Sequence, residues 1–317
     1  MNAYRTWIEQ TRAYRTLVAD KQGRGLHHCY LCITDDTVAL QALLQMAAQL
    51  IVCRNGGCGT CADCQRVEHN NHAAISVCSD TKTDAVRAWM ETSYYAPSEG
   101  DVRVMILPAL DAVEAKTQNI LLKTLEEPTP GVIFLLGAKQ AGAVLDTVKS
   151  RAKKLWMPPF DASVLTEILA EQGIRGTQAQ HIVACSGGSI THALALAGDT
   201  QFAGYYGIVV DILTQMQTSR QVVDMLARLQ PDEASLTCCL DIIEMLMHGI
   251  LRAHASKRAT SEEVRTLAEV YDLATVVNVL GLVTQSRRKL LRHCKVEAIA
   301  DSLLMGILEV KYQCRSL

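Results

Sequence analysis

Residues 102–136 have the sequence VRVMILPALDAVEAKTQNILLKTLEEPTPGVIFLL, which decides the fold class. Val102–Leu107 is a short apolar run, typical of a buried strand. Apolar residues then recur at helical spacing from about Asp111 to Glu126, and the PTPG at residues 128–131 ends that helix because proline cannot donate the hydrogen bonds that continue it. Val132–Leu136 is a second apolar run. This strand–helix–strand order predicts an α/β fold with a parallel sheet.

The same alternation extends towards the amino end. His28–Ile33 is an apolar run that predicts a strand, and Thr37–Val52 carries apolar residues near period 3.6, which predicts a helix. A short apolar run at Ile75–Cys78 and a predicted helix at Asp84–Tyr95 follow. Strand and helix patterns alternate as far as Trp156, so we expect one parallel-sheet domain up to that point.

The pattern changes after Pro158-Pro159, where only helices are predicted. Glycines separate three short helices, and no strand-like run follows them. We therefore predict three domains: an α/β parallel-sheet domain at residues 1–160 with an inserted cysteine module at about 53–64, a small three-helix domain at 161–199, and an all-α domain at 200–317.

The composition limits the possible functions. Hydrophobic residues make up 49% of the chain and charged residues 20%, a globular balance. The formal net charge is −2, so no global field attracts nucleic acid. Without 18 consecutive apolar residues, no membrane association is expected, and Met1–Asp20 lacks the features of a signal peptide. We expect a cytoplasmic protein whose thiols stay reduced.

Four of the twelve cysteines form a C-x4-C-x2-C-x2-C cluster: Cys53, Cys58, Cys61 and Cys64. Four thiolates in a tight turn suit tetrahedral zinc, and glycines between them give the turn its backbone freedom. Because protein ligands would fill all four positions, we predict a structural rather than a catalytic zinc ion. The alternative is four free thiols in a loop.

Two segments resemble subunits of the bacterial DNA polymerase III clamp loader, which are AAA+ proteins with a P-loop-type fold. The first is NILLKTLEEP at Asn119–Pro128, followed by Phe134–Leu136 and by Ser150-Arg151. The second runs from His28 to Cys53, with the cysteine cluster behind it. In that family the gamma/tau subunit is the ATPase, and the delta prime subunit is its inactive relative.

Departures from the ATPase pattern decide which kind of subunit the chain resembles. A phosphate loop has the pattern G-x-x-x-x-G-K-[ST], whereas the corresponding stretch from Thr34 is TDDTVALQ. Ala39 stands at the last glycine, Leu40 at the lysine and Gln41 at the hydroxyl residue. Two aspartates add negative charge where phosphate would lie, so this degenerate loop is not expected to bind ATP.

Three further parts of the family's ATP site are replaced. Pro108-Ala109 stands where the ATPase relatives have the acidic pair that binds Mg²⁺, and Ala138-Lys139 replaces the threonine pair of the first sensor. Thr191 replaces the arginine of the second sensor. The resemblance therefore implies a delta prime-like subunit without intrinsic ATPase activity.

Arg151 is retained, although Ala152 replaces the cysteine of the family's S-R-C motif. In the family this arginine reaches the ATP site of the neighbouring subunit, so the resemblance implies an arginine finger in trans. The alternative is an ordinary surface arginine in a basic, solvated stretch that includes Lys149, Lys153 and Lys154.

The resemblance also implies partners. They are the gamma/tau ATPase subunits, the delta subunit and, indirectly, the sliding clamp and primed DNA. The three-helix domain would be the lid, the all-α domain would join the oligomeric collar, and the chain would be the stator, a non-catalytic part of a DNA polymerase holoenzyme. Two alternatives are an active gamma/tau-like ATPase, which Leu40 and Pro108-Ala109 disfavour, and a zinc-stabilised DNA-binding module, which the net charge disfavours.

Overall fold

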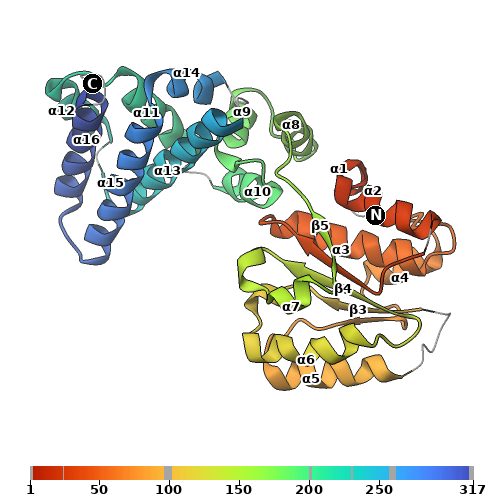
Figure 1. The fold of residues 1–317 in the computed structure, drawn as a ribbon. Helices are drawn as coiled ribbons and strands as arrows, with labels where there is room; N and C mark the ends of the chain where they lie inside the picture. The colour runs from red at the N-terminus through yellow and green to blue at the C-terminus, as the bar shows by residue number, and fades with distance from the viewer. Residues whose placement is uncertain are drawn as a thin grey trace. The chain divides into compact units, whose positions relative to one another are not determined.

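The computed structural model describes residues 3–23, 25–95, 102–199, 202–229, 231–256 and 262–313. The chain divides into two compact units, Met1–Pro159 and Phe160–Leu317. The first unit holds a sheet with helices and the second is helical (Figure 1). The predicted division of the helical part into two domains stays a prediction, and its boundary residue Thr200 lies outside the described residues.

Five parallel strands form the sheet of the first unit. Their spatial order is β2 (Ile75–Val77), β3 (Arg103–Leu107), β4 (Val132–Ala138), β1 (Cys29–Ile33) and β5 (Lys153–Trp156). Every residue of the central strands β1 and β4 is buried, as expected where helices cover both faces of a parallel sheet. The predicted fold class, a parallel-sheet α/β domain followed by helices, is confirmed.

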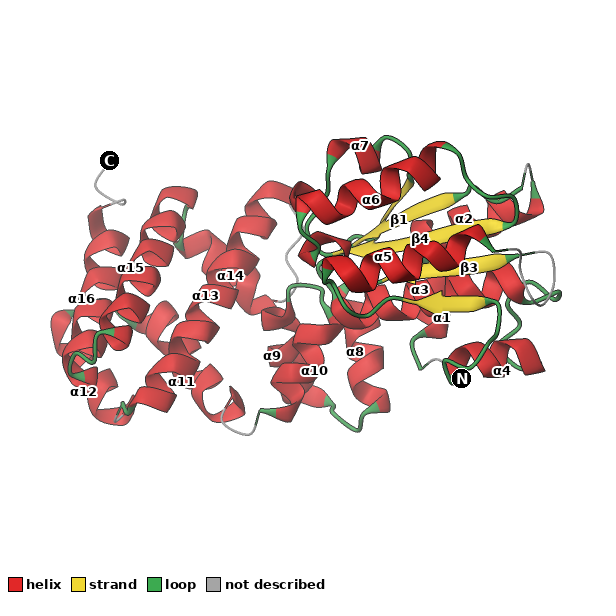
Figure 2. Cartoon of the chain, turned by 90° about the horizontal axis from the view of Figure 1, so that it is seen from below, coloured by secondary structure: helices red, strands yellow, loops and turns green. Residues whose placement is uncertain are grey.

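Helices cover both faces of this sheet. On one face lie α5 and α6, and on the other lies α3 with α1 and α2 outside it (Figures 1 and 2). The helices of this unit are α1 (Arg5–Gln10), α2 (Arg12–Gln22), α3 (Thr37–Val52), α4 (Ala62–Glu68), α5 (Thr83–Glu91), α6 (Ala115–Glu126) and α7 (Asp146–Lys149), with short 3₁₀ turns η1 (Thr92–Tyr94), η2 (Leu110–Ala112) and η3 (Ala141–Ala143).

Helix α3 is apolar almost all round because it is covered on both sides. It contacts β1, β3 and β4 on one side and α1 and α2 on the other. Eleven of its 16 residues are buried. The two ends of α3 are capped by Asp36 and Cys53, and each end belongs to a candidate site.

Helix α6 begins at Ala115, four residues later than predicted. Asp111 instead lies in the turn η2, where its Oδ2 accepts hydrogen bonds from the backbone N–H groups of Lys139 and Gln140, both at 3.0 Å. A side chain that satisfies two backbone donors of a distant loop favours a turn over a helix at its own position.

The second unit is built around α13, which contacts α9, α11, α14 and α15. Residues such as Leu240, Ile243 and Met247 are almost fully buried there, so the apolar face of α13 forms core. The helices are α8 (Ala162–Glu171), α9 (Gly176–Ser186), α10 (Ile190–Gly198), α11 (Phe202–Gln215), α12 (Ser219–Leu229), α13 (Glu233–Ser256), α14 (Glu262–Val270), α15 (Leu273–Leu291) and α16 (Val296–Gln313).

By length and composition alone, α13 is apolar enough over Glu233–Ala255 to cross a membrane. More than half of its apolar window, 56%, is buried inside the unit. A helix at the centre of a helical core has the same composition, so this feature by itself does not identify a membrane span.

Candidate functional site

The amino end of α3 is capped by a side chain of the same chain. Asp36 is 3% exposed, and its Oδ1 accepts a hydrogen bond from the backbone N–H of Ala39 at 3.1 Å. The backbone N–H of Asp36 donates to Thr34 Oγ1 at 3.3 Å. Only residues 34–36 separate β1 from α3. A carboxylate therefore holds the position at the helix amino end where a phosphate would bind.

The residues that replace the phosphate-loop pattern lie in the first turns of α3. Ala39 and Leu40 are 0% and 3% exposed, so the Leu40 side chain belongs to the core and does not face a ligand. Gln41 is exposed, and so is Asp35 in the preceding turn. The amino end of a helix attracts anions, but two adjacent carboxylates, Asp35 and Asp36, oppose a polyphosphate at this one.

A cavity of about 910 Å³ lies beside α3 in the first unit. Its lining includes Gln41 of α3 and Pro108, which directly follows β3. Pro108-Ala109 is the pair that stands where the ATPase relatives have the acidic residues that bind Mg²⁺. None of its described lining residues is a lysine or an arginine, whereas Glu68 is among them. The cavity therefore lacks the cations that polyphosphate sites use.

Replacing Asp36 by alanine is expected to lower the free energy of unfolding by about 1–2 kcal/mol, because the cap of α3 is lost. Asparagine at this position should retain most of the stability, since its side-chain oxygen caps equally well. Denaturant unfolding of both variants measures the effect, with the exposed Asp35→Ala as the matched control. Equal stability of Asp36→Ala and Asp35→Ala would refute the cap.

Arg151 lies at the opposite edge of the sheet from this helix end. It lies two residues before β5, whose first residue, Lys153, pairs with Tyr30 near the start of β1. The strands are parallel, so all their amino ends share the edge near Arg151, and their carboxyl ends share the edge at residues 34–36. At about 3.3 Å per residue, the two places are roughly 20 Å apart along the strands. Arg151 is therefore remote from the degenerate loop of its own chain.

The guanidinium group of Arg151 is held at the surface by three contacts. Its Nη2 donates to Glu126 Oε1 at 2.5 Å, and its Nη1 donates to the backbone carbonyl of Thr147 at 3.0 Å and to Ser150 Oγ at 3.4 Å. The Arg151 side chain is 33% exposed and that of Glu126 is 52% exposed. Glu126 is the last residue of α6 and belongs to the NILLKTLEEP segment at Asn119–Pro128, which contributed only to the family resemblance.

The lysines around Arg151 are largely neutralised by the chain itself. Lys149 Nζ forms an ion pair with Asp146 at 2.8 Å, and Lys153 Nζ contacts Asp20 at 2.6 Å. Lys154 is exposed. Paired lysines have little charge left for DNA phosphates, which favours a solvated face at this edge.

The remaining replaced positions lie in two different units. Ala138 is fully buried at the end of β4, and Lys139 follows it in the turn braced by Asp111. Thr191 lies in the second unit, in the first turn of α10, where Ser189 caps the helix by accepting from the backbone N–H of His192 at 3.3 Å. Neither Ala138 nor Thr191 carries a charge that could contact phosphate.

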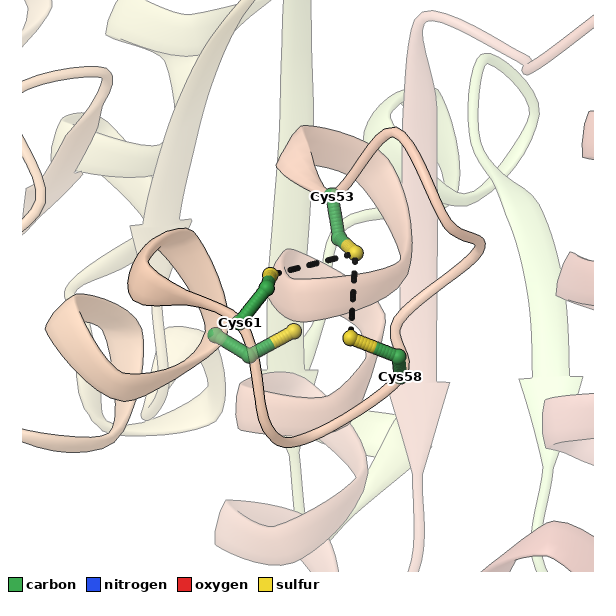
Figure 3. A group of neighbouring side chains, drawn as sticks. Cys53, Cys58 and Cys61 are labelled. Carbon is green, nitrogen blue, oxygen red and sulfur yellow. Dashed lines mark hydrogen bonds between the residues drawn. The ribbon is translucent and has the colours of Figure 1, made fainter.

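The four predicted cysteines come together. Cys53 Sγ lies 3.8 Å from Cys58 Sγ and 3.6 Å from Cys61 Sγ, and these side chains point towards one another (Figure 3). With Cys64 included, all four sulfur atoms lie within 4.8 Å of one another. Four sulfurs at about 2.3 Å from one zinc ion stand about 3.8 Å apart in a tetrahedron, so this arrangement fits zinc.

Two helix ends and three glycines position the cysteines. Cys53 caps the carboxyl end of α3, and Cys61 occupies the amino cap of α4. The loop between them has positive φ angles of 69°, 78° and 79° at three residues, which non-glycine residues rarely adopt. These residues are Gly56, Gly57 and Gly59, the glycines between the cysteines that were expected to give the turn its freedom.

Backbone N–H groups lower the pKa of two thiols of the cluster, Cys53 and Cys58, whereas burial raises the pKa of Cys64. The backbone N–H of Thr60, followed by that of Cys61, lowers the pKa of the Cys58 thiol to about 6. Burial raises the pKa of Cys53, but hydrogen bonds from the N–H groups of Cys58 and Gly57 outweigh it, and the net shift is downwards. Thiolate is the form of cysteine that binds metal.

Two cations from the N-terminal helices hold the cysteine loop. Arg5 donates to the carbonyl of Gly57 at 2.8 Å and to Gln49 Oε1 at 2.5 Å. Lys21 donates to the carbonyl of Cys53 at 2.9 Å, at the end of α3, where a positive charge also suits the helix dipole. Sequence reasoning missed both residues, because a charge on an amphipathic helix does not reveal its distant partner.

The chain is similar in sequence to subunits of DNA polymerase III. The profile of a family described as "DNA polymerase III, delta subunit" matches residues 9–161. The delta' subunit of DNA polymerase III from Yersinia pestis is 32% identical over 180 residues, 53% of this chain and 52% of that protein. The delta' subunit from Bacillus subtilis is 27% identical over 202 residues, 61% of each chain.

The tau subunit of DNA polymerase III from Escherichia coli is also similar. It is 27% identical over 267 residues, which cover 77% of this chain. The match spans only 39% of the tau subunit, and the matches to the two delta' subunits span between half and two thirds of those proteins. Residues 9–161, which the family profile matches, include the sheet, the four cysteines and Arg151.

Proposed function

We propose that this chain is a clamp-loader subunit like the DNA polymerase III subunits to which it is similar. It would be a delta prime-type stator without ATPase activity of its own, and Arg151 would serve the ATP site of a neighbouring subunit. The observation that carries this proposal is the separation between Arg151 and the degenerate phosphate loop of the same chain. Arg151 lies at the amino edge of the sheet, and the degenerate phosphate loop lies at its carboxyl edge.

The groups at the amino end of α3 support the proposal that this chain has no ATP site of its own. The buried carboxylate of Asp36 caps the helix, Leu40 is in the core, and the described lining of the nearby cavity has no cation. Parallel α/β sheets bind their ligands at the carboxyl ends of the strands. At that edge the chain has carboxylates in place of the groups that hold phosphate, and Pro108-Ala109 in place of the acidic pair that holds Mg²⁺.

The trans role is supported by the exposure and the chemistry of Arg151. A planar guanidinium group presents donors in a fork that matches phosphate oxygens. Arg151 keeps this group at the surface, 33% exposed, at an edge of the sheet where its own chain has no phosphate loop. An arginine in this position can complete an ATP site only if that site belongs to another subunit.

The proposed partners follow from the family. They are gamma/tau-type ATPase subunits and the delta subunit, with the sliding clamp and primed DNA contacted through the assembly. The helical unit would supply the lid and the collar of the complex, and the protein would act in the cytoplasm. The active gamma/tau-like ATPase and the zinc-stabilised DNA-binding module remain the alternatives, and the paired lysines near Arg151 disfavour the second.

The four-cysteine cluster is proposed to hold one structural zinc ion. The ligands would be Cys53, Cys58, Cys61 and Cys64, whose sulfur spacing fits a tetrahedral ion. An ion with four protein ligands supplies no open position for chemistry, so its part is to fix the loop between α3 and α4.

The isolated chain is expected to bind ATP–Mg²⁺ with a Kd weaker than about 1 mM, which corresponds to less than about 4 kcal/mol of binding free energy. The reason is that Leu40 replaces the phosphate-binding lysine and that the loop before α3 carries the carboxylates of Asp35 and Asp36. Titration with a fluorescent ATP analogue measures the affinity, and a gamma/tau-type ATPase in the same assay is the control. A micromolar Kd with turnover would replace this proposal by the active-ATPase alternative.

A further inference from the structure

We propose that Glu126 is a latch on Arg151: it holds the guanidinium group in the resting subunit, and Arg151 must leave it to stabilise phosphate charge in the neighbouring ATP site. This inference rests on the function proposed above for Arg151. It adds a residue that controls when the arginine acts. The contact that carries it is the hydrogen-bonded ion pair of 2.5 Å between Arg151 Nη2 and Glu126 Oε1.

The electrostatics of the pair require that it open for catalysis. An arginine stabilises the transferring phosphoryl group through its positive charge. A carboxylate 2.5 Å from the guanidinium group cancels most of the positive potential that Arg151 exerts on a phosphate farther away. The carboxylate would also repel the phosphate directly. The state that accelerates hydrolysis is therefore one in which Glu126 has been displaced by the phosphate oxygens.

The pair is weak enough to open. Both side chains lie at the surface, with Arg151 33% and Glu126 52% exposed, and ion pairs of this kind contribute little because water and salt screen them. The second anchor of the guanidinium group, from Nη1 to the Thr147 carbonyl at 3.0 Å, does not involve Glu126. Arg151 can thus lose the carboxylate and still be oriented by α7.

Glu126 is not needed for the helix that carries it. A carboxylate in the last turn of a helix is unfavourable to the helix dipole, and Glu126 is the last residue of α6. Its neighbours Thr124 and Leu125 supply the buried contacts at this end, each with at most 2% exposed. Glu126→Gln should therefore fold normally, and it removes the charge while keeping the side-chain size.

The test uses the complex reconstituted with gamma/tau-type ATPase subunits, the delta subunit and this full chain. ATP hydrolysis is measured with and without the sliding clamp and primed DNA. Glu126→Gln is expected to raise the unstimulated rate about two- to fivefold, the factor that an exposed ion pair is worth. The fully stimulated rate should stay unchanged, so the stimulation ratio falls by the same factor.

Glu127→Gln is the matched control, since Glu127 is exposed and its side chain has no hydrogen bond or ion pair in the described part of the chain. It makes the same charge change one residue away and should leave both rates unchanged. The double variant Arg151→Ala with Glu126→Gln should behave like Arg151→Ala alone, because a latch without its arginine controls nothing. A purely structural role for Glu126 would lower the rates and could not raise the unstimulated one.

The outcomes separate the latch from the function on which it rests. If Arg151→Ala leaves hydrolysis unchanged, the trans role is wrong and the latch fails with it. If Arg151→Ala lowers hydrolysis but Glu126→Gln leaves the unstimulated rate unchanged or lowers it, only the latch is wrong. An equal rise in Glu127→Gln would also overturn the latch, because it would reflect general surface charge.

Discussion

Arg151→Ala is expected to lower ATP hydrolysis by on the order of 10³-fold at the one ATP site that receives this arginine. The transferring phosphoryl group gathers negative charge, and the neighbouring subunit would lose the cation that compensates it. The measurement is clamp- and DNA-stimulated hydrolysis by the reconstituted complex, with the other ATP sites silenced by mutation of their own arginines. Arg151→Lys should recover only part of the rate, because lysine keeps the charge but lacks the planar fork.

Lys154→Ala is the matched control for Arg151→Ala. It removes an exposed cation three residues away, at the same edge of the sheet, and should leave hydrolysis unchanged. Assembly of the complex should be compared by gel filtration for both variants, so that a loss of activity is not a loss of the subunit. Normal stimulated hydrolysis by an assembled Arg151→Ala complex would contradict the trans role.

Cys64→Ser is expected to abolish stoichiometric zinc binding and to destabilise the first unit strongly. Cys64 is fully buried, and the free energy of binding a structural metal contributes directly to folding, so the expected loss is on the order of 5 kcal/mol or more. The apparent Tm should fall by about 10 °C or more. Metal analysis of the purified protein and thermal unfolding with and without a chelator measure the two effects.

Cys78→Ser is the matched control for the metal site. Cys78 is also buried, but it lies outside the cluster and its Sγ donates to the carbonyl of Asp80 at 3.2 Å, which a serine hydroxyl can replace. This variant should keep about one equivalent of zinc. Less than about half an equivalent in unchelated wild-type protein would count against a four-thiolate zinc site.

The two sites have different consequences for the protein. The cysteine cluster fixes the loop after α3, and Arg5 and Lys21 attach that loop to the N-terminal helices. Metal loss is therefore expected to loosen one side of the sheet domain. Arg151 lies between α7 and β5, and its side chain contacts Glu126, Thr147 and Ser150 rather than the cysteine loop, so its removal should change activity without a comparable loss of stability.

The sequence by itself determined the features that depend on local pattern. Alternating apolar runs and helical periods predicted the four strands near residues 28–33, 75–78, 102–107 and 132–136, and the structure confirms all four. The spacing of the cysteines predicted a cluster, and the sulfur atoms do converge. These predictions succeeded because each signal lies within a few consecutive residues, where the periods of strands and helices and the reach of a turn are fixed by geometry.

Only the tertiary structure decided which side chains meet across long separations. Arg151 contacts Glu126, 25 residues away, and Arg5 contacts the carbonyl of Gly57, 52 residues away. It also placed Arg151 and the degenerate loop at opposite edges of the sheet, which depends on the order of the strands. No local pattern carries this information, because the order and register of parallel strands are set by packing between segments that are distant in the chain.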